Sequence, residues 1–388
     1  MGQGTRKTAE NGLAQSPRSP HDGARRRLLT SGLGAAALAG VAAIAAPAVR
    51  GAERPAANRV WRLVTSWPLN APGPGTTAAR IAQQITQLSN GRLTVKIYAA
   101  GELVPPLGVF DAVAAGTAEM AHTASLFWSG KAAIAPLFTA APFGLLPESH
   151  NAWIDFGGGQ ALWDELYGKF GVKPLLAGNS GFQMGGWYNK EITGLDDFKG
   201  LKVRMPGLGG EILRRLGGVP ITLAPGEIFQ ALQTGMIDGA EFLGPWSDGA
   251  LGLDRIAAYY YWPGYHEPNG SAEALINRAA FDALPADLRQ LIVTVCAAEN
   301  QRGMSEAEWF NAQTLDRLIQ EGKVRLRPFP EAVLTQARRI SEDLMSELAA
   351  KDELSGRIIE SYLDAKRQAI AWGAITRQAL LKQQSQES

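Results

Sequence analysis

The sequence predicts an α/β fold of two lobes, with long helices at the C-terminal end of the chain. Strand and helix patterns alternate between residues 60 and 124, and the same order returns between residues 172 and 243. Strand–helix–strand order favours helices on both faces of a largely parallel sheet. Because two such blocks follow each other in one chain, we expect two lobes with a crevice between them, which is a common place for a ligand.

The first block begins with an apolar run and continues with a helical face formed by Ile81, Ile85 and Leu88. Hydrophobic periodicity predicts, in order, a strand over 60–66, a helix over 76–88, a strand over 93–98, a helix over 107–115 and a short apolar segment at 119–124.

The second block shows the same alternation of strands and helices. It predicts strands over 172–177, 182–188, 201–205, 219–223 and 237–243, and a helix over 225–232 that Pro225 opens and Gly235 closes. We place the hinge strands of the two lobes near Ala177–Phe182 and near Pro268–Ala274.

Three long helices are expected after residue 284, over 286–320, 330–350 and 353–384. Charged and apolar residues mix along them at helical spacing, as in helices that pack over a larger body. The pattern leaves two interpretations open, namely a solvated brace across both lobes or a contact with a second copy of the chain.

Composition argues against nucleic acid as a partner. Of 388 residues, 38 are Lys or Arg and 37 are Asp or Glu, for a net charge of +1. Residues 1–48 hold six of the basic and two of the acidic side chains, so the remainder is slightly acidic. A near-neutral body has no overall bias toward a polyanion.

Familiar catalytic motifs are missing from the sequence. It contains no phosphate-binding loop, no G-x-S-x-G elbow and no H-E-x-x-H, and its four histidines have no metal-ligand spacing. Cys296 is the only cysteine, so no internal disulfide is possible, and its apolar neighbours indicate a buried side chain. We therefore expect a protein that is not an enzyme.

The N-terminal segment reads as an export signal. Arg25-Arg26-Arg27-Leu28-Leu29 is followed by a run rich in Ala, Gly and Leu over 33–46, which matches a charged region and a short apolar region. Paired arginines before two leucines suggest twin-arginine export of residues 49–388, with 1–48 as the signal. A membrane anchor is the alternative, but a span needs about 20 strongly apolar residues. We expect a periplasmic protein.

Arg204 ends a predicted strand, and its guanidinium can give a carboxylate two parallel charge-assisted hydrogen bonds. The segment Gly194–Arg204 and the segment Ala231–Glu241 together resemble the receptors of TRAP transporters over nearly the whole body of the chain. This resemblance implies a periplasmic-binding-protein-like fold, a membrane permease as partner, and Arg204 as the residue that holds the substrate carboxylate.

Two further segments, Ser180–Trp187 and Trp262–Pro268, look most like the subgroup that binds 2-oxo acids such as pyruvate together with a sodium or calcium ion. The resemblance implies Gln183 on the ligand or the ion, Glu241 as an ion ligand and Glu267 as a further polar contact. Phe242 stands where the subgroup usually has Trp. Its main-chain carbonyl can still reach the ion, but any indole hydrogen bond is lost, which leaves the substrate preference open.

The predicted organisation has four parts: a signal over 1–48, lobe I over 58–181 and about 270–309, lobe II over 182–269 and about 310–337, and C-terminal helices over 338–388 with a possible homodimer contact. Trp67, Phe127, Trp128 and Trp246 are expected mainly in the core, with pocket lining as the second reading. Two alternatives remain: a receptor for a hydroxy acid such as lactate or another organic acid, and a periplasmic lyase or hydrolase that uses Glu241 and Glu267 as an acid–base pair.

Overall fold

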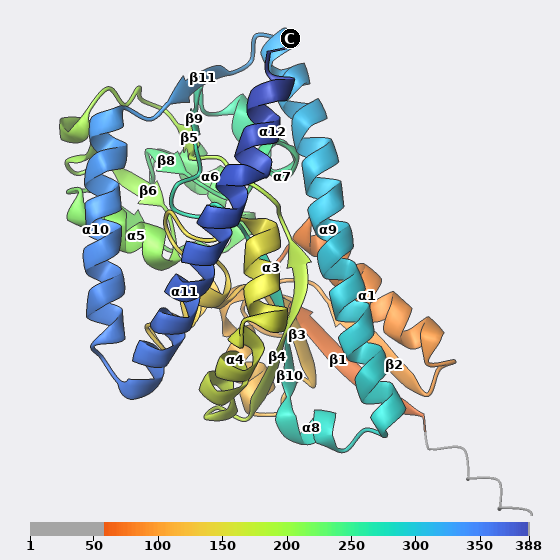
Figure 1. Cartoon of the computed structure of the whole chain (residues 1–388). Helices are drawn as coiled ribbons and strands as arrows, with labels where there is room; N and C mark the ends of the chain where they lie inside the picture. Colours follow the sequence, from red (N-terminus) through yellow and green to blue (C-terminus); the bar gives the residue numbers. More distant parts are fainter. Residues whose placement is uncertain (1–57, 387–388) are drawn as a thin grey trace, which may run out of the picture. The chain divides into compact units, whose positions relative to one another are not determined.

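Two mixed β-sheets form the framework of residues 58–386, the part of the chain that the computed structural model describes (Figure 1). The predicted signal over 1–48 lies outside these residues. Within 58–386 no helix combines the length and the apolar character that a membrane span requires.

The first sheet has five strands in the order β2-β1-β3-β10-β4. Strands β1, β2 and β3 run parallel, whereas β10 is antiparallel to both of its neighbours. The bounds are β1 (Arg59–Thr65), β2 (Leu93–Tyr98), β3 (Met120–Thr123), β4 (Val172–Asn179) and β10 (Ser271–Asn277).

The second sheet has six strands in the order β11-β9-β5-β8-β6-β7. Here β5 is antiparallel to β8 and to β9, and the other pairs are parallel. The bounds are β5 (Gly186–Tyr188), β6 (Lys202–Arg204), β7 (Val219–Ile221), β8 (Gly239–Ala240), β9 (Tyr259–Trp262) and β11 (Arg325–Pro328).

The expectation of largely parallel sheets was wrong, and the reason lies in two segments that link the sheets. The chain leaves the first sheet after β4 and joins the second at β5, and it returns from β9 to β10. The two links run side by side, since the Ser180 amide donates to the Gly270 carbonyl at 2.9 Å. Because they run in opposite directions, the strands that they connect become antiparallel neighbours in each sheet.

The helices agree with the prediction best at the C-terminal end, where α9 and α10 begin and end within one residue of the expected bounds. The expected helix over 353–384 is interrupted at Thr376. The sequence analysis missed α3, α4, α5, α7 and α8. The bounds are α1 (Pro74–Leu88), α2 (Val109–Ala114), α3 (Pro147–Phe156), α4 (Gly159–Gly168), α5 (Gly207–Arg215), α6 (Ile228–Gln233), α7 (Pro245–Ala250), α8 (Arg278–Asp282), α9 (Ala286–Gln320), α10 (Glu331–Ala349), α11 (Glu353–Ile375) and α12 (Arg377–Gln384). Short 3-10 turns occupy 106–108, 125–128, 135–138, 195–198, 225–227 and 253–255.

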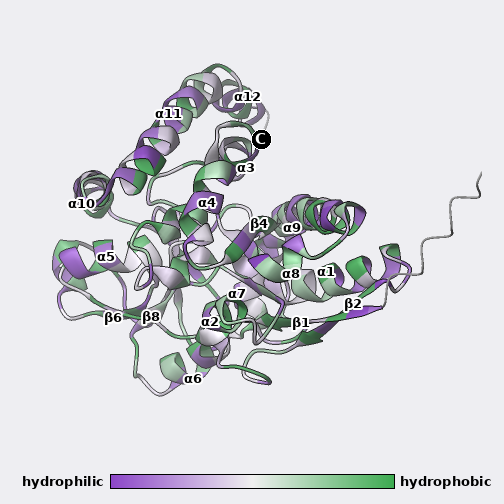
Figure 2. Ribbon diagram, turned by 90° about the horizontal axis from the view of Figure 1, so that it is seen from below, coloured by the Kyte–Doolittle hydropathy of each residue, from purple (hydrophilic) through white to green (hydrophobic). Residues whose placement is uncertain are grey.

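Helix α9 packs on α1 and on β4 of the first sheet. It also packs on α7, which follows β8 of the second sheet, so it contacts both parts of the fold. Hydrophilic and hydrophobic residues alternate along α9 and α11 (Figure 2), as expected for helices that cover a body with one face. Cys296 lies on the inner face of α9 and is buried with a free thiol.

Candidate functional site

A cavity between the two sheets gathers the residues that the sequence analysis singled out. Its volume is about 50 Å³, which is room for a few water molecules, since one water needs at least about 10–15 Å³ measured in this way. Only a small solute fits the cavity in this conformation. The first sheet and its helices contribute Trp67, Thr77, Leu126 and Ser271, the links contribute Asn179, Ser180, Gln183 and Gly270, and the second half contributes Arg204, Glu241, Phe242 and Trp246.

Arg204 ends β6, where its backbone lies opposite Ala240 of β8, so the guanidinium is buried beside the residues that follow β8. Its Nη1 donates to the Glu241 carboxylate at 2.5 Å and to the Glu241 carbonyl at 2.6 Å, and Nε donates to the Leu223 carbonyl at 3.4 Å. Nη2 donates to no other group within residues 58–386. The sequence analysis expected an open fork of two nitrogens, but Nη2 alone is free for a ligand carboxylate.

The site contains two carboxylates for one guanidinium. Glu241 and Glu267 are both buried, and the Nε2 atom of His266 lies 3.1 Å from the second Glu241 oxygen. Burial, followed by the negative charge of Glu241, raises the pKa of Glu267 well above its ordinary value, although Arg204 acts in the opposite direction. The raised pKa favours the neutral form of Glu267, which leaves Arg204 and Glu241 as a charge-balanced pair with no spare positive charge for an entering anion.

Gln183 supplies an oxygen without a partner. Its Nε2 donates to the Ser180 hydroxyl at 3.0 Å, and its Oε1 is buried with no hydrogen bond among the described residues. A buried acceptor in this state costs free energy unless a ligand satisfies it.

The main chain at Phe242 supplies a second oxygen without a hydrogen-bond partner. The carbonyl before it accepts from Arg204, and the Leu243 carbonyl after it accepts from the Met184 amide at 3.0 Å. The Phe242 carbonyl accepts no hydrogen bond from any residue between 58 and 386. Of three successive carbonyls, the middle one is left for a ligand.

These groups fit a hard cation. Sodium and calcium prefer oxygen, and a carboxylate, an amide oxygen and a main-chain carbonyl are the donor types that proteins offer them. In the described residues no three His, Cys, Asp or Glu side chains gather to hold a metal ion. A cation here would therefore be held by the mixed set of Glu241, Gln183 Oε1 and the Phe242 carbonyl, completed by oxygens of the solute.

Trp67 forms an apolar wall that a buried histidine fixes. Its indole donates to His122 Nδ1 at 2.8 Å, and His122 Nε2 donates to the Ala177 carbonyl at 2.9 Å. Burial lowers the pKa of His122 to about 4, so the ring stays neutral and keeps one acceptor and one donor. Phe127 and Trp246 also line the cavity, whereas Trp128 is a core residue that donates to Glu273.

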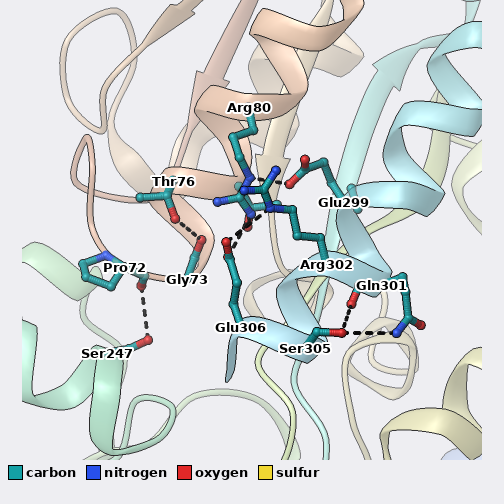
Figure 3. A network of polar contacts seen from close by, with 12 residues as sticks. Pro72, Gly73, Thr76, Arg80, Ser247, Glu299, Gln301, Arg302, Ser305 and Glu306 are labelled. Carbon is teal, nitrogen blue, oxygen red and sulfur yellow. Dashed lines mark hydrogen bonds and ion pairs between the residues drawn. The ribbon is translucent and has the colours of Figure 1, made fainter. Parts of the chain in front are cut away.

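Polar contacts lie at and near the cavity rim, and one of them, between Ser247 and Pro72, joins the two predicted lobes. The Ser247 hydroxyl of α7 donates to the Pro72 carbonyl at 3.1 Å, and the Trp246 amide donates to Asn311 of α9 at 3.0 Å. Nearby, Arg80 of α1 pairs with Glu299 and Glu306 of α9 (Figure 3). The Ser247–Pro72 bond closes the rim at this point, whereas the pairs of Arg80 fasten α1 to α9.

The structure brings all five predicted site residues to one cavity, namely Gln183, Arg204, Glu241, Phe242 and Glu267. Behind the cavity wall lie three residues that the sequence analysis did not assign: His122 bonds Trp67, His266 bonds Glu241 and Asp248 accepts from the Leu243 amide. No sequence motif identifies them.

Two α/β halves around a small cavity with a cationic nitrogen and free oxygens define the class of solute-binding receptors. Within this class, the chain belongs to family 7 of the bacterial extracellular solute-binding proteins, whose family model matches residues 64–352. It is accordingly a periplasmic receptor and not an enzyme, which confirms the predicted family, fold class and location. The lyase or hydrolase alternative is thereby excluded.

Three similar proteins have names that state what they bind. A monocarboxylate 2-oxoacid-binding periplasmic protein of Nostoc sp. is 39% identical over 318 residues, which are 82% of this chain and 87% of the relative. A TRAP periplasmic solute-binding protein of Pseudoalteromonas atlantica, solved with sodium and pyruvate, has 36% identity and a TM-score of 0.81 over 84% of this chain and 99% of its own. One from Bordetella bronchiseptica, solved as a dimer with calcium and picolinate, has 34% identity and a TM-score of 0.83 over 85% and 98%.

Proposed function

We propose that this receptor captures a small 2-oxo monocarboxylate such as pyruvate together with Na⁺ or Ca²⁺, and delivers it to the membrane permease of a TRAP transporter. The observation that carries the proposal is the free Nη2 of Arg204 in one small cavity with two unpartnered oxygens, Gln183 Oε1 and the Phe242 carbonyl. The pyruvate, sodium, calcium and picolinate of the solved relatives support it.

The chemistry of a 2-oxo acid matches this arrangement. Its carboxylate accepts from Arg204 Nη2, while one carboxylate oxygen and the 2-oxo oxygen form a chelating pair for the cation. Picolinate offers the same pair as an oxygen and a ring nitrogen. Neutralising a buried anion from two sides offsets its desolvation better than one guanidinium can.

The test is binding to protein that has been unfolded and refolded to remove bound solute. Calorimetry and thermal unfolding are measured in choline buffer with pyruvate, lactate or propionate, each with and without NaCl or CaCl₂. We expect pyruvate to stabilise the protein in a concentration-dependent way that requires the cation. Propionate lacks the 2-oxo oxygen and serves as the control. Equal stabilisation by propionate, or none by any 2-oxo acid, contradicts the proposal, and a stronger response to lactate assigns the site to hydroxy acids.

The sheets also support the predicted lobes, with lobe I over 58–181 and about 270–309 and lobe II over 182–269 and about 310–337. The hinges predicted near Ala177–Phe182 and near Pro268–Ala274 overlap the two segments that link the sheets, and ligand would shift the population toward the closed form. Small-angle scattering should show a smaller radius of gyration when pyruvate and calcium are added. An unchanged radius would contradict a hinge motion.

The C-terminal helices within 338–388 support a homodimer. Five large apolar residues of α11 and α12 are each more than half exposed, namely Ile370, Trp372, Ile375, Leu380 and Leu381. Contiguous exposed apolar surface of this kind marks an interface. Light scattering should report a dimer that the double substitution of Trp372 and Ile375 by Asp converts to monomers. Trp309→Asp on α9, at a similarly exposed tryptophan, should leave the dimer intact.

Export by the twin-arginine route rests on the sequence of residues 1–48. Replacing Arg26 and Arg27 by Lys should trap the protein in the cytoplasm, whereas Arg18→Lys should not. Cell fractionation reads the outcome, and unchanged export of the double variant would contradict this route.

A further inference from the structure

Asp248 of α7 is a fully buried carboxylate that does not line the cavity. Three donors converge on it. The Leu243 amide donates to Oδ1 at 3.0 Å, and the Tyr260 hydroxyl and the Trp187 indole donate to Oδ2 at 2.8 and 3.2 Å. Among the described residues no Lys, Arg or His forms an ion pair with it. A buried carboxylate without a cationic partner is costly, so its retention calls for a physical reason.

The amide that Asp248 holds belongs to the same peptide unit as the Phe242 carbonyl. The unit is planar and trans, so its N–H and C=O point in opposite directions. Fixing the Leu243 N–H on Asp248 therefore fixes the direction of the Phe242 carbonyl, the one that accepts no hydrogen bond among the described residues. A hydrogen bond to a carboxylate also polarises the unit and increases the negative charge on the carbonyl oxygen.

The other two donors explain why the residue is an aspartate. Trp187 of β5 and Tyr260 of β9 are buried and stack with ring centroids 4.0 Å apart. The indole nitrogen can only donate, so the atom facing it must be an acceptor. An asparagine that kept its oxygen toward Leu243 would turn its NH₂ group toward the indole N–H. The rigid aromatic pair thus selects a residue with two acceptor oxygens.

We propose that Asp248 is the positioning residue of the cation, because it orients and polarises the Phe242–Leu243 peptide so that the Phe242 carbonyl becomes a cation ligand. The inference rests on the proposed function, since it concerns the cation of that site. Outer partners of ligands typically contribute about 10- to 100-fold to metal affinity. Asp248 acts through the backbone and touches neither the solute nor the cation.

The sequence allows a direct measurement, because Phe is followed by Leu only once, at 242–243. Full-length mature protein carrying ¹³C′-Phe and ¹⁵N-Leu therefore gives a single HNCO cross-peak, which reports the Phe242 carbonyl and the Leu243 amide together. We expect a Leu243 amide proton shifted downfield by the bond to Asp248. We also expect the carbonyl carbon to shift when CaCl₂ is added, with and without pyruvate.

Asp248→Asn provides the affinity test. The calcium concentration for half-maximal pyruvate binding should rise about 10- to 100-fold, while pyruvate affinity at saturating calcium should return to near the wild-type value. A merely structural role would weaken pyruvate binding equally at every calcium concentration. Tyr260→Phe removes one donor but keeps the Asp248 carboxyl group and its bond to Leu243, so its calcium midpoint should stay near that of the wild type.

The outcomes separate this inference from the proposed function. If calorimetry detects no pyruvate binding, the proposed function fails, and the response of the cross-peak to calcium alone still decides the role of Asp248. If pyruvate and calcium bind while the carbonyl shift stays constant, the proposal for Asp248 is overturned. A Leu243 amide proton without a downfield shift overturns it as well, even where Asp248→Asn does not fold.

Discussion

Replacing Arg204 by Lys tests whether the two terminal nitrogens of its guanidinium have different roles. In the structure Nη1 is committed to Glu241 through two short bonds, and Nη2 is left for the solute. A lysine keeps the positive charge, but its single ammonium group on a flexible stem cannot occupy both positions. We expect it to remain with Glu241, because leaving that buried carboxylate alone costs about 3–5 kcal/mol.

The solute then loses one charge-assisted hydrogen bond, worth about 1.5–3 kcal/mol. This corresponds to a roughly 10- to 150-fold weaker pyruvate affinity. Stability without ligand should change little in Arg204→Lys, whereas Arg204→Ala should lose about 3–5 kcal/mol in addition to binding, because Glu241 becomes unpaired. Calorimetry at saturating calcium and urea titration measure the two effects.

The control is Arg215→Lys. Arg215 also bridges two glutamates, Glu211 and Glu347, but it lies outside the cavity. Both its pyruvate affinity and its stability should stay close to those of the wild type. The reasoning about Arg204 is refuted if Arg204→Lys binds pyruvate within threefold of the wild type. It is also refuted if Arg204→Ala is as stable as the wild type.

Three further changes follow from the cavity and its surroundings. A Cβ at Gly270 would collide with the Gln183 amide, so Gly270→Ala should weaken pyruvate binding at least about tenfold, whereas Gly168→Ala, with open space around it, should not change binding. Phe242→Ala should shift preference toward longer 2-oxo acids in a calorimetric panel, because the ring is part of the cavity wall; unchanged selectivity would contradict this. Burial raises the pKa of Glu273 from its ordinary value of 4.5 to about 8, so the folded state keeps a proton that the unfolded chain releases, and stability should fall as the pH rises through this range. Urea titrations of Glu273→Gln should show a smaller fall, because the pKa of buried Asp248 is also raised, to about 7, and an identical pH profile would argue against a buried, protonated Glu273.

The sequence predicts those parts of the site whose chemistry resides in side chains. Arg204 and Glu241 stand at the ends of short strands in two segments that resemble a known receptor family, and both enter the cavity. The strands predicted over 182–188 and 237–243 are much shorter in the structure. Gln183 and Phe242 fall in the unpaired remainders, where the chain leaves the sheet to line the cavity.

Other parts could not be predicted because they depend on three-dimensional hydrogen bonding. The free carbonyl of Phe242 is visible only when the partners of the neighbouring carbonyls are known, and Asp248 has no motif around it. The missed pair α3 and α4 had a local signal, since Pro147 begins the first helix and Gly157 follows its end. Their buried Trp153 and Trp163 pack around Phe138, which is a tertiary contact.

The need for charge balance explains why the proposed site would take up a cation together with the acid. The anionic solute would join Glu241 and Glu267 against Arg204 alone, so acid and cation should bind in a mutually dependent way. Burial and Glu241 both raise the pKa of Glu267, and this residue decides the balance. With Glu267 protonated, a monovalent cation and Arg204 together neutralise Glu241 and the acid. With Glu267 ionised, the same balance needs a divalent cation. Under the proposed function, charge balance in this cavity therefore admits a monovalent cation beside a neutral Glu267 and a divalent cation beside an ionised one.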